Sequence, residues 1–381
     1  MNYLYPGLPQ VTAQIGRRAH PDVLANRIAQ EVLASVVSQD PNARADINVT
    51  VGEFISLDAK IRSTSPPQKK EIAELARETV RKVGYTEEWG YDPSSKDIII
   101  GGNGQSANID HAVSNGGAGD TITKIGFATF ETSHGLPLPT VLARVIKSQL
   151  DLRYTSSTIP YLGPDGKINV GVWYENGEPK YATFVVVAAQ HSKGLSEQQL
   201  EKFKSSIKDE VVIPDLGEWY DHKKTRIIVN GARLFDHGGP SVDTGVKGKK
   251  DHDHSYGDFI GTIGGSAYGK DGSKLDLQGH ILTRNIALSI VKSELAKVVK
   301  VTITYPIGGK QPIQLSFDMM GTGTVADSEL EAIVRENFPL EPVEIIKRFD
   351  LSNPQNFLRT ADHFFGSSSF RWEHPVILNH H

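Results

Sequence analysis

The tripeptide His20-Pro21-Asp22 joins an imidazole to a carboxylate at the expected start of a helix. Backbone N–H groups at a helix N-terminus lack partners within the helix and favour anions. An imidazole and a carboxylate placed there could therefore hold a phosphate group together with a metal ion. An aspartate in the first helical turn is also ordinary capping chemistry, and the tripeptide alone favours that simpler interpretation.

Two glycine motifs imitate nucleotide-binding loops. Gly264 to Lys270 has the G-x-x-x-x-G-K spacing of a P-loop, but Asp271 stands where the magnesium-binding Ser or Thr belongs. This departure argues against a kinase-like NTPase. Residues 102–107 match the dinucleotide pattern G-x-G-x-x-A after a short expected strand, yet no strong helix follows them. We interpret this second match as chance.

The run Asp251-His252-Asp253-His254 offers a candidate zinc site. In a strand, its two histidines would point to the same face, which would suit a metal ion. No third ligand is identifiable, however, and the neighbouring lysines oppose a cation. The sequence favours a solvated polar segment at this place.

Other loops are rich in glycine and charge. Residues 231–272 hold 11 glycines interspersed with lysines and aspartates, which predicts loops that approach a ligand or a neighbour closely. A flexible linker between domains is the alternative. The glycine loop 116–120 ends in Asp120 and could grip an amino group or a metal ion, and Pro164-Asp165-Gly166-Lys167 is typical of a β-turn.

The elements that must position these residues follow from periodicity and turn signals. Apolar residues at helical spacing mark the predicted helices, and β-branched or aromatic runs mark the predicted strands. Hairpin-like strand pairs alternate with helices, which predicts α+β layers rather than continuous βαβ winding. The predicted helices are 21–39, a segment after Pro67 that ends at Gly84, a segment that begins with the capping box of Ser196 and Gln199, 279–298 and 327–337; the predicted strands are 97–100, 167–174, 181–189, 226–229, 299–305 and 313–317.

Composition limits the classes of protein to which the chain can belong. With 381 residues, 38% of them hydrophobic and 23% charged, the sequence predicts two or three globular domains. A net charge of −4 gives no electrostatic case for a nucleic-acid or membrane partner. The chain has no cysteine, no signal-peptide pattern and no long apolar run, so we expect a soluble protein of the cytoplasm.

Taken together and in order, these segments resemble the bacterial S-adenosylmethionine synthetases over nearly the whole chain. His20-Pro21-Asp22 is similar to the family's opening motif and Gly117-Ala118-Gly119-Asp120 to its Gly-Ala-Gly-Asp signature. The ungapped spacing from Gly238 to Asp271 sets Asp243, Lys249 and Lys250 on the family's acidic residue and Arg-Lys pair. The other segments that carry the resemblance are 39–44, 126–129, 131–132, 164–167, 190–192, 238–240 and 269–276.

The resemblance implies a fold and a reaction. The fold would be three similar two-layer α/β domains related by pseudo-threefold symmetry, at about 1–103, 116–236 and 237–375, with strands exchanged between them. The methionine sulfur would attack the 5′ carbon of ATP, and the released triphosphate would be hydrolysed to pyrophosphate and phosphate. The enzyme would need Mg²⁺, with K⁺ as a weaker activator, and would place its active sites between the subunits of a homodimer or of a dimer of dimers.

The resemblance also implies roles for individual residues. Catalysis would fall to His20, Lys167, Lys249, Lys250 and Lys270, with His20 facing the C–O bond that breaks. The phosphates, ribose and adenine would contact these same residues together with Asp165, Phe235, Lys274 and Asp276. Methionine would contact Gln105, Asp120, Asp243 and Lys274, and the metal ligands would be Asp22, Asp243 and Asp276.

Several positions depart from the family pattern. The potassium-binding glutamate of the family falls at Asn48, a methionine-pocket glutamate at Lys60, and a lysine of the mobile loop at Gly104. The family's Arg-Lys pair is Lys249-Lys250 here. These changes predict weak K⁺ activation. They also leave two alternatives: a homologue that hydrolyses triphosphate but has lost or changed its methionine specificity, and a non-enzymatic subunit.

Overall fold

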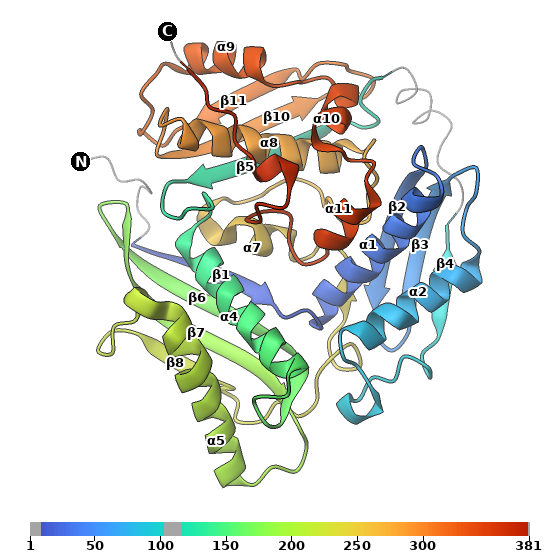
Figure 1. The fold of residues 1–381 in the computed structure, drawn as a ribbon, viewed down its shortest axis with the longest axis vertical. Coiled ribbons are helices and arrows are strands. Elements are labelled where there is room, and N and C mark those ends of the chain that lie inside the picture. Colours follow the sequence, from blue (N-terminus) through green and yellow to red (C-terminus); the bar gives the residue numbers. More distant parts are fainter. Residues whose placement is uncertain (1–8, 103–115, 380–381) are drawn as a thin grey trace.

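The computed structural model describes residues 9–102 and 116–379, whose strands form three sheets with helices packed against them (Figure 1). The strand orders are β4-β3-β2-β9, β1-β6-β7-β8 and β11-β10-β5. Each sheet has buried apolar residues on the face that its helices cover. Two mixed sheets and one antiparallel sheet with helices packed on them agree with the predicted α+β class.

The first sheet is built mainly from residues that follow helix α1 (Pro21–Gln39). Alternate residues of β2, from Ala45 to Val51, are buried against α1 and give the strand its period of two. Helix α2 (Lys69–Lys82) packs beside α1. The strands are β2 (Arg44–Val51), β3 (Ile55–Arg62), β4 (Ile98–Gly101) and β9 (Gly245–Val246).

The second sheet centres on a long hairpin. Its turn residues Asn176 and Gly177 have φ of 54° and 79°, the left-handed conformation that a two-residue hairpin loop requires. Helix α4 (Leu138–Thr155) packs on β6 and β1, and helix α5 (Glu197–Ile207) contacts β7 through Phe203 and His191. The strands are β1 (Gln10–Gly16), β6 (Leu162–Glu175), β7 (Glu178–His191) and β8 (Arg226–Val229).

The third sheet supports the most deeply buried helix of the described chain, α8 (Leu275–Lys292). At Gly126 of β5, an added Cβ would lie 2.3 Å from the Thr283 carbonyl carbon, so this glycine lets helix and strand touch. Helix α9 (Asp327–Asn337) packs beside β11. The strands are β5 (Ile122–Thr129), β10 (Val298–Tyr305) and β11 (Gln314–Asp318).

Each sheet includes one strand from a distant part of the chain. Strand β1 pairs with β6, β5 pairs with β10, and β9 pairs with β2. The three-domain architecture is therefore interlocked. The sequential boundaries 1–103, 116–236 and 237–375 stay a proposal, because strands that lie in different segments pair with one another.

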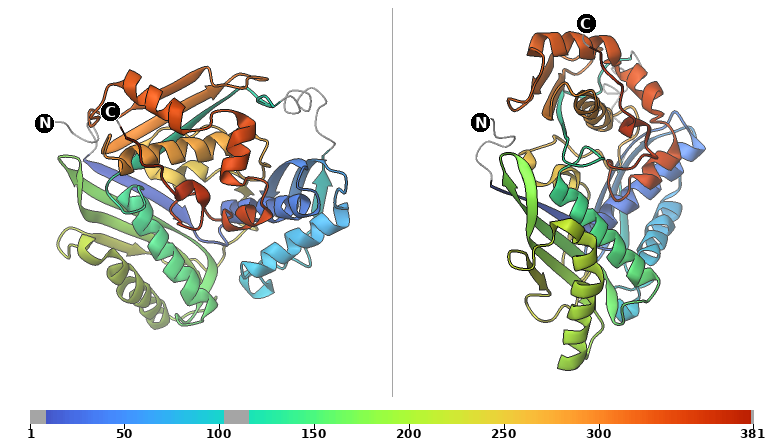
Figure 2. Two further views of the ribbon diagram at one scale, coloured as in Figure 1. Left: turned by 45° about the horizontal axis from the view of Figure 1, so that its top comes forward. Right: turned by 60° about the vertical axis from the view of Figure 1, so that its left-hand side comes forward.

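Short helices complete the chain, and one of them, α11 (Pro354–Arg359), lies against α1 in the views of Figure 2. Gln30 of α1 donates to Thr360 Oγ1 at 2.7 Å, and Arg27 pairs with Asp362. The short elements are α6 (Ile213–Leu216), α7 (Asp251–Tyr256), α10 (Pro342–Phe349), α11 (Pro354–Arg359), the 3-10 turns Glu87–Trp89, Gly217–Trp219, Gly257–Phe259 and Arg371–Glu373, and the π-helix Lys208–Val212.

Several predicted elements are confirmed to the residue. Helices 21–39 and 327–337 and strand 226–229 have the predicted bounds, and the capping box of Ser196 and Gln199 is formed. Helix α8 begins four residues before the predicted start at Gly279 and ends six residues before Val298, because the chain turns after Ser293, with Glu294 at a left-handed φ of 60°, before β10 begins. The predicted turn 164–167 lies inside β6, where the ladder to β7 shifts register.

The segment Asp251–His254 forms a helical turn, α7, so its two histidines lie on different sides and do not have the strand geometry that a zinc site there would need. The favoured expectation of a solvated polar segment was wrong, because Asp251 and His254 are buried. His254 Nε2 accepts a hydrogen bond from the Gly16 N–H at 3.0 Å, so the ring supports the end of β1.

Candidate active site

His20 caps the N-terminus of α1. Its Nδ1 accepts a hydrogen bond from the backbone N–H of Asp22 at 3.3 Å, and the residue is 6% exposed. An Nδ1 that accepts is unprotonated, so the proton of the neutral ring sits on Nε2. The capping bond therefore leaves His20 with one N–H to donate to a ligand.

Asp22 lies in the first turn of α1 and is almost wholly buried. Its Oδ1 accepts from the Val246 N–H at 2.9 Å, which ties the helix to β9. The Lys249 ammonium lies 3.7 Å from the same oxygen. Gly245 allows the approach, since a Cβ there would lie 2.1 Å from the Pro21 carbonyl oxygen. The glycine-rich segment thus closes on the helix N-terminus, as its composition predicted.

Asp165 approaches the same helix end from β6. Its Oδ2 accepts from the Gly239 N–H at 2.7 Å, and its Oδ1 accepts from Gly166 at 2.6 Å. A Cβ added to Gly238 would lie 3.0 Å both from Asp165 Oδ2 and from the Phe235 ring. Asp165 and the Phe235 ring therefore flank the same glycine turn.

Electrostatics tie these residues together. Burial lowers the pKa of His20, while the carboxylates of Asp165, Asp22 and Asp243 raise it and Lys167 lowers it further. Burial raises the pKa of Asp165, and His20 is the largest opposing influence. His20 is therefore neutral near pH 7. We call this the first charged group: His20, Asp22, Asp165, Lys167, Asp243 and Lys249.

Arg17 holds the first charged group in place and was missed by the sequence reasoning. The side chain is fully buried, and its guanidinium donates to Asp151 Oδ1 at 2.9 Å, to the Gly163 carbonyl at 2.7 Å and to the Asp165 carbonyl at 3.3 Å. These bonds fix the start of β6 beside the turn that leads into α1. The only sequence signal was an arginine pair just before His20.

A second charged group surrounds Lys270. Lys270 pairs with Asp276 in the first turn of α8, and Lys247 lies 3.8 Å from Asp46 Oδ1. The Lys124 ammonium, on β5, donates to the Gly265 carbonyl at 2.5 Å. We call this the second charged group: Lys124, Lys247, Lys270, Asp46, Asp251 and Asp276.

The side chains of the second charged group influence one another's pKa, and several of them are buried. Burial lowers the pKa of Lys124 to about 8 and also lowers that of Lys247, against the attraction of the nearby aspartates. Burial raises the pKa of Asp251 to about 6. An arriving phosphate would favour the charged form of each lysine. Neither Lys124 nor Lys247 was among the predicted site residues.

Helix α1 keeps the two groups apart. Asp22 lies in its first turn, whereas Gln30 Oε1 accepts from the Gly269 N–H, next to Lys270, at 2.9 Å. Eight residues at ~1.5 Å each place these contact points about 12 Å apart along the helix. The predicted site residues thus fall into two places on one chain.

The remaining predicted residues lie around these groups. The Lys250 ammonium pairs with Asp253 at 3.1 Å, and Lys274 is the N-cap residue of α8, two residues before Asp276. Asp120 is exposed and follows the glycine loop; its neighbour Thr121 accepts from the Ile307 N–H at 3.1 Å through Oγ1. Gln105 lies outside the described residues.

The predicted metal ligands are divided in the same way. Asp22 and Asp243 belong to the first charged group, and Asp276 belongs to the second. Within residues 9–102 and 116–379, no three His, Asp or Glu side chains gather closely enough to hold a metal ion. Carboxylate oxygens are the hard ligands that Mg²⁺ prefers, so the donors fit the ion although one chain does not assemble them.

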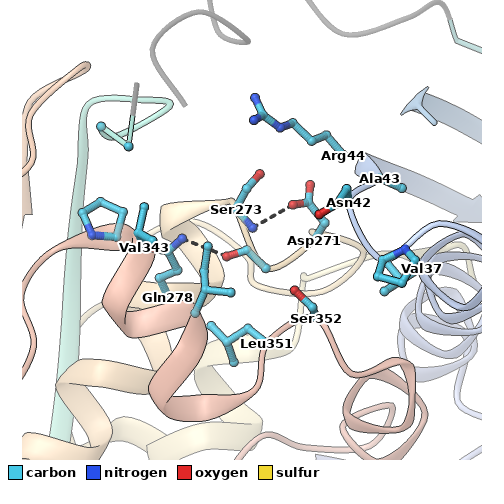
Figure 3. A pocket seen from close by; sticks show the side chains of 16 residues that line it. Val37, Asn42, Ala43, Arg44, Asp271, Ser273, Gln278, Val343, Leu351 and Ser352 are labelled. Carbon is cyan, nitrogen blue, oxygen red and sulfur yellow. Dashed lines mark hydrogen bonds between the residues drawn. The ribbon is translucent and has the colours of Figure 1, made fainter. Parts of the chain in front are cut away.

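A cavity of about 270 Å³ lies near the second charged group, between the β2 end of the first sheet and α10 (Figure 3). Ser273 and Gln278 line it, and the Arg44 side chain extends over it. None of its lining residues, all of them described, belongs to the predicted site.

No described helix is long and apolar enough to cross a membrane.

Comparisons with known proteins give matches over nearly the whole chain. The family models of the S-adenosylmethionine synthetase N-terminal, central and C-terminal domains match residues 10–107, 115–235 and 237–374. The S-adenosylmethionine synthase of Desulfosudis oleivorans is 34% identical over 376 residues, covering 95% of each chain. Those of Wolinella succinogenes and Thermus thermophilus are each 33% identical, covering 95% of this chain and 94% and 95% of theirs.

Proposed function

The chain belongs to the S-adenosylmethionine synthetase family, and from this premise we propose that its two charged groups are halves of one active site. As a methionine adenosyltransferase, the enzyme transfers the adenosyl group of ATP to the sulfur of L-methionine. It then hydrolyses the released triphosphate to pyrophosphate and phosphate. The first charged group of one subunit meets the second charged group of its partner in a homodimer.

One observation carries this proposal: the predicted residues are divided along α1. His20 and Asp22 lie at its first turn, and Gly269, next to Lys270, contacts it at Gln30. A triphosphate chain needs cations along its whole length, and one group alone offers too few. A twofold axis would join both pairs of groups at once and would complete two identical sites. Such dimers can pair further into tetramers.

In the first step, the sulfur lone pair forms a bond to C5′ of ATP while the C5′–O bond breaks. The electron pair of that bond stays on the triphosphate oxygen. The Nε2–H of His20 donates a hydrogen bond to this oxygen, and the bond strengthens as negative charge develops there. The lowered pKa of His20 keeps the ring neutral, with its free proton on Nε2.

The lysines stabilise the triphosphate. Lys167, Lys249 and Lys250 approach it from the first-group side, and Lys270 and Lys274 approach it from the second-group side of the partner. Lys270 exchanges its bond to Asp276 for a phosphate oxygen, which leaves Asp276 available to a cation. Fixed charges of this kind need no reorganisation at the moment of reaction, and they also hold the triphosphate for hydrolysis.

Mg²⁺ would be held by Asp22, Asp243 and Asp276, and it would neutralise charge on the phosphate oxygens. K⁺ has a weaker case. Asn48 stands where the resemblance places a potassium-binding glutamate, and its amide donates to Asp46 Oδ1 at 3.3 Å.

We place the reaction in the cytoplasm, in keeping with a chain that lacks cysteine.

The nucleoside and methionine must lie side by side in the site, because the methionine sulfur has to reach C5′ of the ribose. Phe235 stacks on adenine and Asp165 contacts the ribose, since both flank the Gly238 turn beside His20. Asp120, Asp243, Lys274 and Gln105 surround methionine. Ile307, which is 56% exposed beside Thr121, offers apolar surface for the thioether.

The test is product analysis. The protein is incubated with ATP, L-methionine and Mg²⁺, and the products are identified by mass. We expect S-adenosylmethionine, pyrophosphate and phosphate in equal amounts. Formation of phosphate from added tripolyphosphate without S-adenosylmethionine would favour the homologue with changed methionine specificity. Lys60, which replaces a family glutamate and faces Asp46 in the β2–β3 ladder, gives that alternative its basis. Absence of both activities would overturn the proposal.

A further inference from the structure

Lys124 is a lysine without access to solvent. It lies near the start of β5 and is 0% exposed, a rare state for a lysine because burial of its charge is costly. Two glycines make room for its stem: a Cβ at Gly279 would lie 2.8 Å from Lys124 Cγ, and one at Gly264 would lie 3.1 Å from Cδ. The backbone on both sides is thus shaped around this side chain.

The ammonium of Lys124 reaches the loop that presses on Asp276. It donates to the Gly265 carbonyl at 2.5 Å. A Cβ at Gly265 would lie 2.5 Å from Asp276 Oδ1, so this glycine lies directly against the carboxylate. The contacts therefore run from Lys124 through Gly265 to Asp276, which pairs with Lys270.

A second charge faces Lys124 from α7. Asp251 is buried, its Oδ2 accepts from the Ala267 N–H at 3.2 Å, and its Oδ1 has no hydrogen-bond partner in the described structure. Asp251 and Asp276 both attract the Lys124 ammonium, and Lys270 repels it. Lys124 is thus a buried cation that lies behind the Lys270–Asp276 pair.

We propose that Lys124 is a positioning residue for phosphate binding, which fixes Gly265 against Asp276 and keeps a positive charge beside Asp276 when Lys270 turns to the substrate. The inference rests on the proposed function of the second charged group. Lys124 touches no substrate itself. It acts by orienting Asp276, in the same way that residues hydrogen-bonded to metal ligands orient those ligands in other proteins.

A positioning role and a merely structural role predict different results for Lys124→Met. Methionine has nearly the same length and volume, but it leaves the buried Asp251 carboxylate and the Gly265 carbonyl without the Lys124 ammonium, so the melting temperature should fall in either case. A positioning role predicts that the folded variant binds tripolyphosphate less well. A merely structural role predicts normal binding by the folded fraction.

The experiment compares tripolyphosphate binding by calorimetry for wild type, Lys124→Met and Lys124→Gln, in the absence of the Mg²⁺ that hydrolysis requires. We expect affinity to fall by roughly 10- to 100-fold in both variants, with KM for methionine unchanged. Lys180→Met, on the surface of β7, serves as the control and should bind normally. Lys124→Gln keeps a donor for the Gly265 carbonyl, so it carries the test if the methionine variant does not fold.

Wild-type affinity in either folded variant would overturn the inference. An equal rise of KM for methionine and ATP would overturn it as well, because that pattern reports general disturbance. The proposed function is judged separately by S-adenosylmethionine formation in the wild type. Weakened tripolyphosphate binding in the variants of an enzyme that makes no S-adenosylmethionine would refute the proposed activity and leave the role of Lys124 standing.

Discussion

His20 combines two tasks in one imidazole, since Nδ1 caps α1 and Nε2 carries the free proton. In His20→Ala we expect S-adenosylmethionine formation to fall by roughly 100-fold or more, because a donor to the developing oxyanion is lost. Loss of the cap should cost only about 1 kcal/mol of stability. Hydrolysis of added tripolyphosphate should suffer less, because it breaks a P–O bond farther along the chain.

The measurement is both activities in one His20→Ala preparation, with folding followed by thermal melting. Equal losses would assign His20 a structural or general phosphate-binding role. Full synthesis would remove it from the mechanism.

Lys249 is half-exposed and lies 3.7 Å from Asp22 Oδ1, so its ammonium can turn to a phosphate at small cost. We predict that Lys249→Ala slows triphosphate hydrolysis by about 100-fold, as expected for loss of a fixed charge. Lys202→Ala, on the exposed side of α5, is the control and should keep wild-type rates. Near-normal hydrolysis in Lys249→Ala would show that this lysine does not face the phosphates.

Asn48 offers an amide where K⁺ would need a carboxylate. We therefore predict an absolute need for Mg²⁺ but only weak stimulation by K⁺. Turnover is measured with K⁺ replaced by a bulky organic cation at constant ionic strength. A collapse of the rate under this exchange would contradict the prediction and would place a potassium site elsewhere in the molecule.

At the scale of elements, the contact between β9 and α1 positions the first charged group. A Cβ at Gly245 would overlap the Pro21 carbonyl at 2.1 Å. Gly245→Ala should therefore push the helix N-terminus away, lower stability by roughly 1–3 kcal/mol and weaken ATP binding. Gly261→Ala is the matched control, because its Cβ would meet no atom within 4 Å. Both are assessed by chemical unfolding and by KM for ATP; equal effects would contradict the prediction.

The elements show which sequence signals were sufficient. Helix α1 carries a proline start and a regular apolar stripe, and its predicted bounds are confirmed. In strands β2 and β3, buried residues alternate with polar ones that include Asp and Lys. Because Asp and Lys have low strand propensity, this period of two did not lead to a strand prediction. Segment 251–254 was expected to be solvated because all four side chains are polar, yet Asp251 and His254 are buried in a helical turn that ends at Gly257.

At the scale of the molecule, the family motifs identified the residue types of the site but not their supports. Arg17 reaches Asp151 and Gly163, and Lys124 reaches Gly265, across more than 130 positions of sequence. Such contacts follow from how the three sheets interlock, which no local pattern encodes. The division of the predicted residues between two places along α1 also emerged only from the fold.

The central claim is that each active site takes its first charged group from one subunit and its second from the other. Intersubunit complementation tests it most directly. His20→Ala disables the first group and Lys270→Ala disables the second, so each variant alone should be nearly inactive. Coexpressed from differently tagged copies, the variants should form mixed dimers in which one of the two sites contains only wild-type residues.

The measurement is S-adenosylmethionine formation by the coexpressed pair and by each variant alone. If chains pair at random, half of the dimers are mixed and each has one intact site, so we predict roughly a quarter of wild-type activity. Purified mixed dimers, which carry both tags, should reach about half. If both groups instead acted within a single chain, every site would lack one group, and the mixed dimers would be no more active than the sum of the two variants.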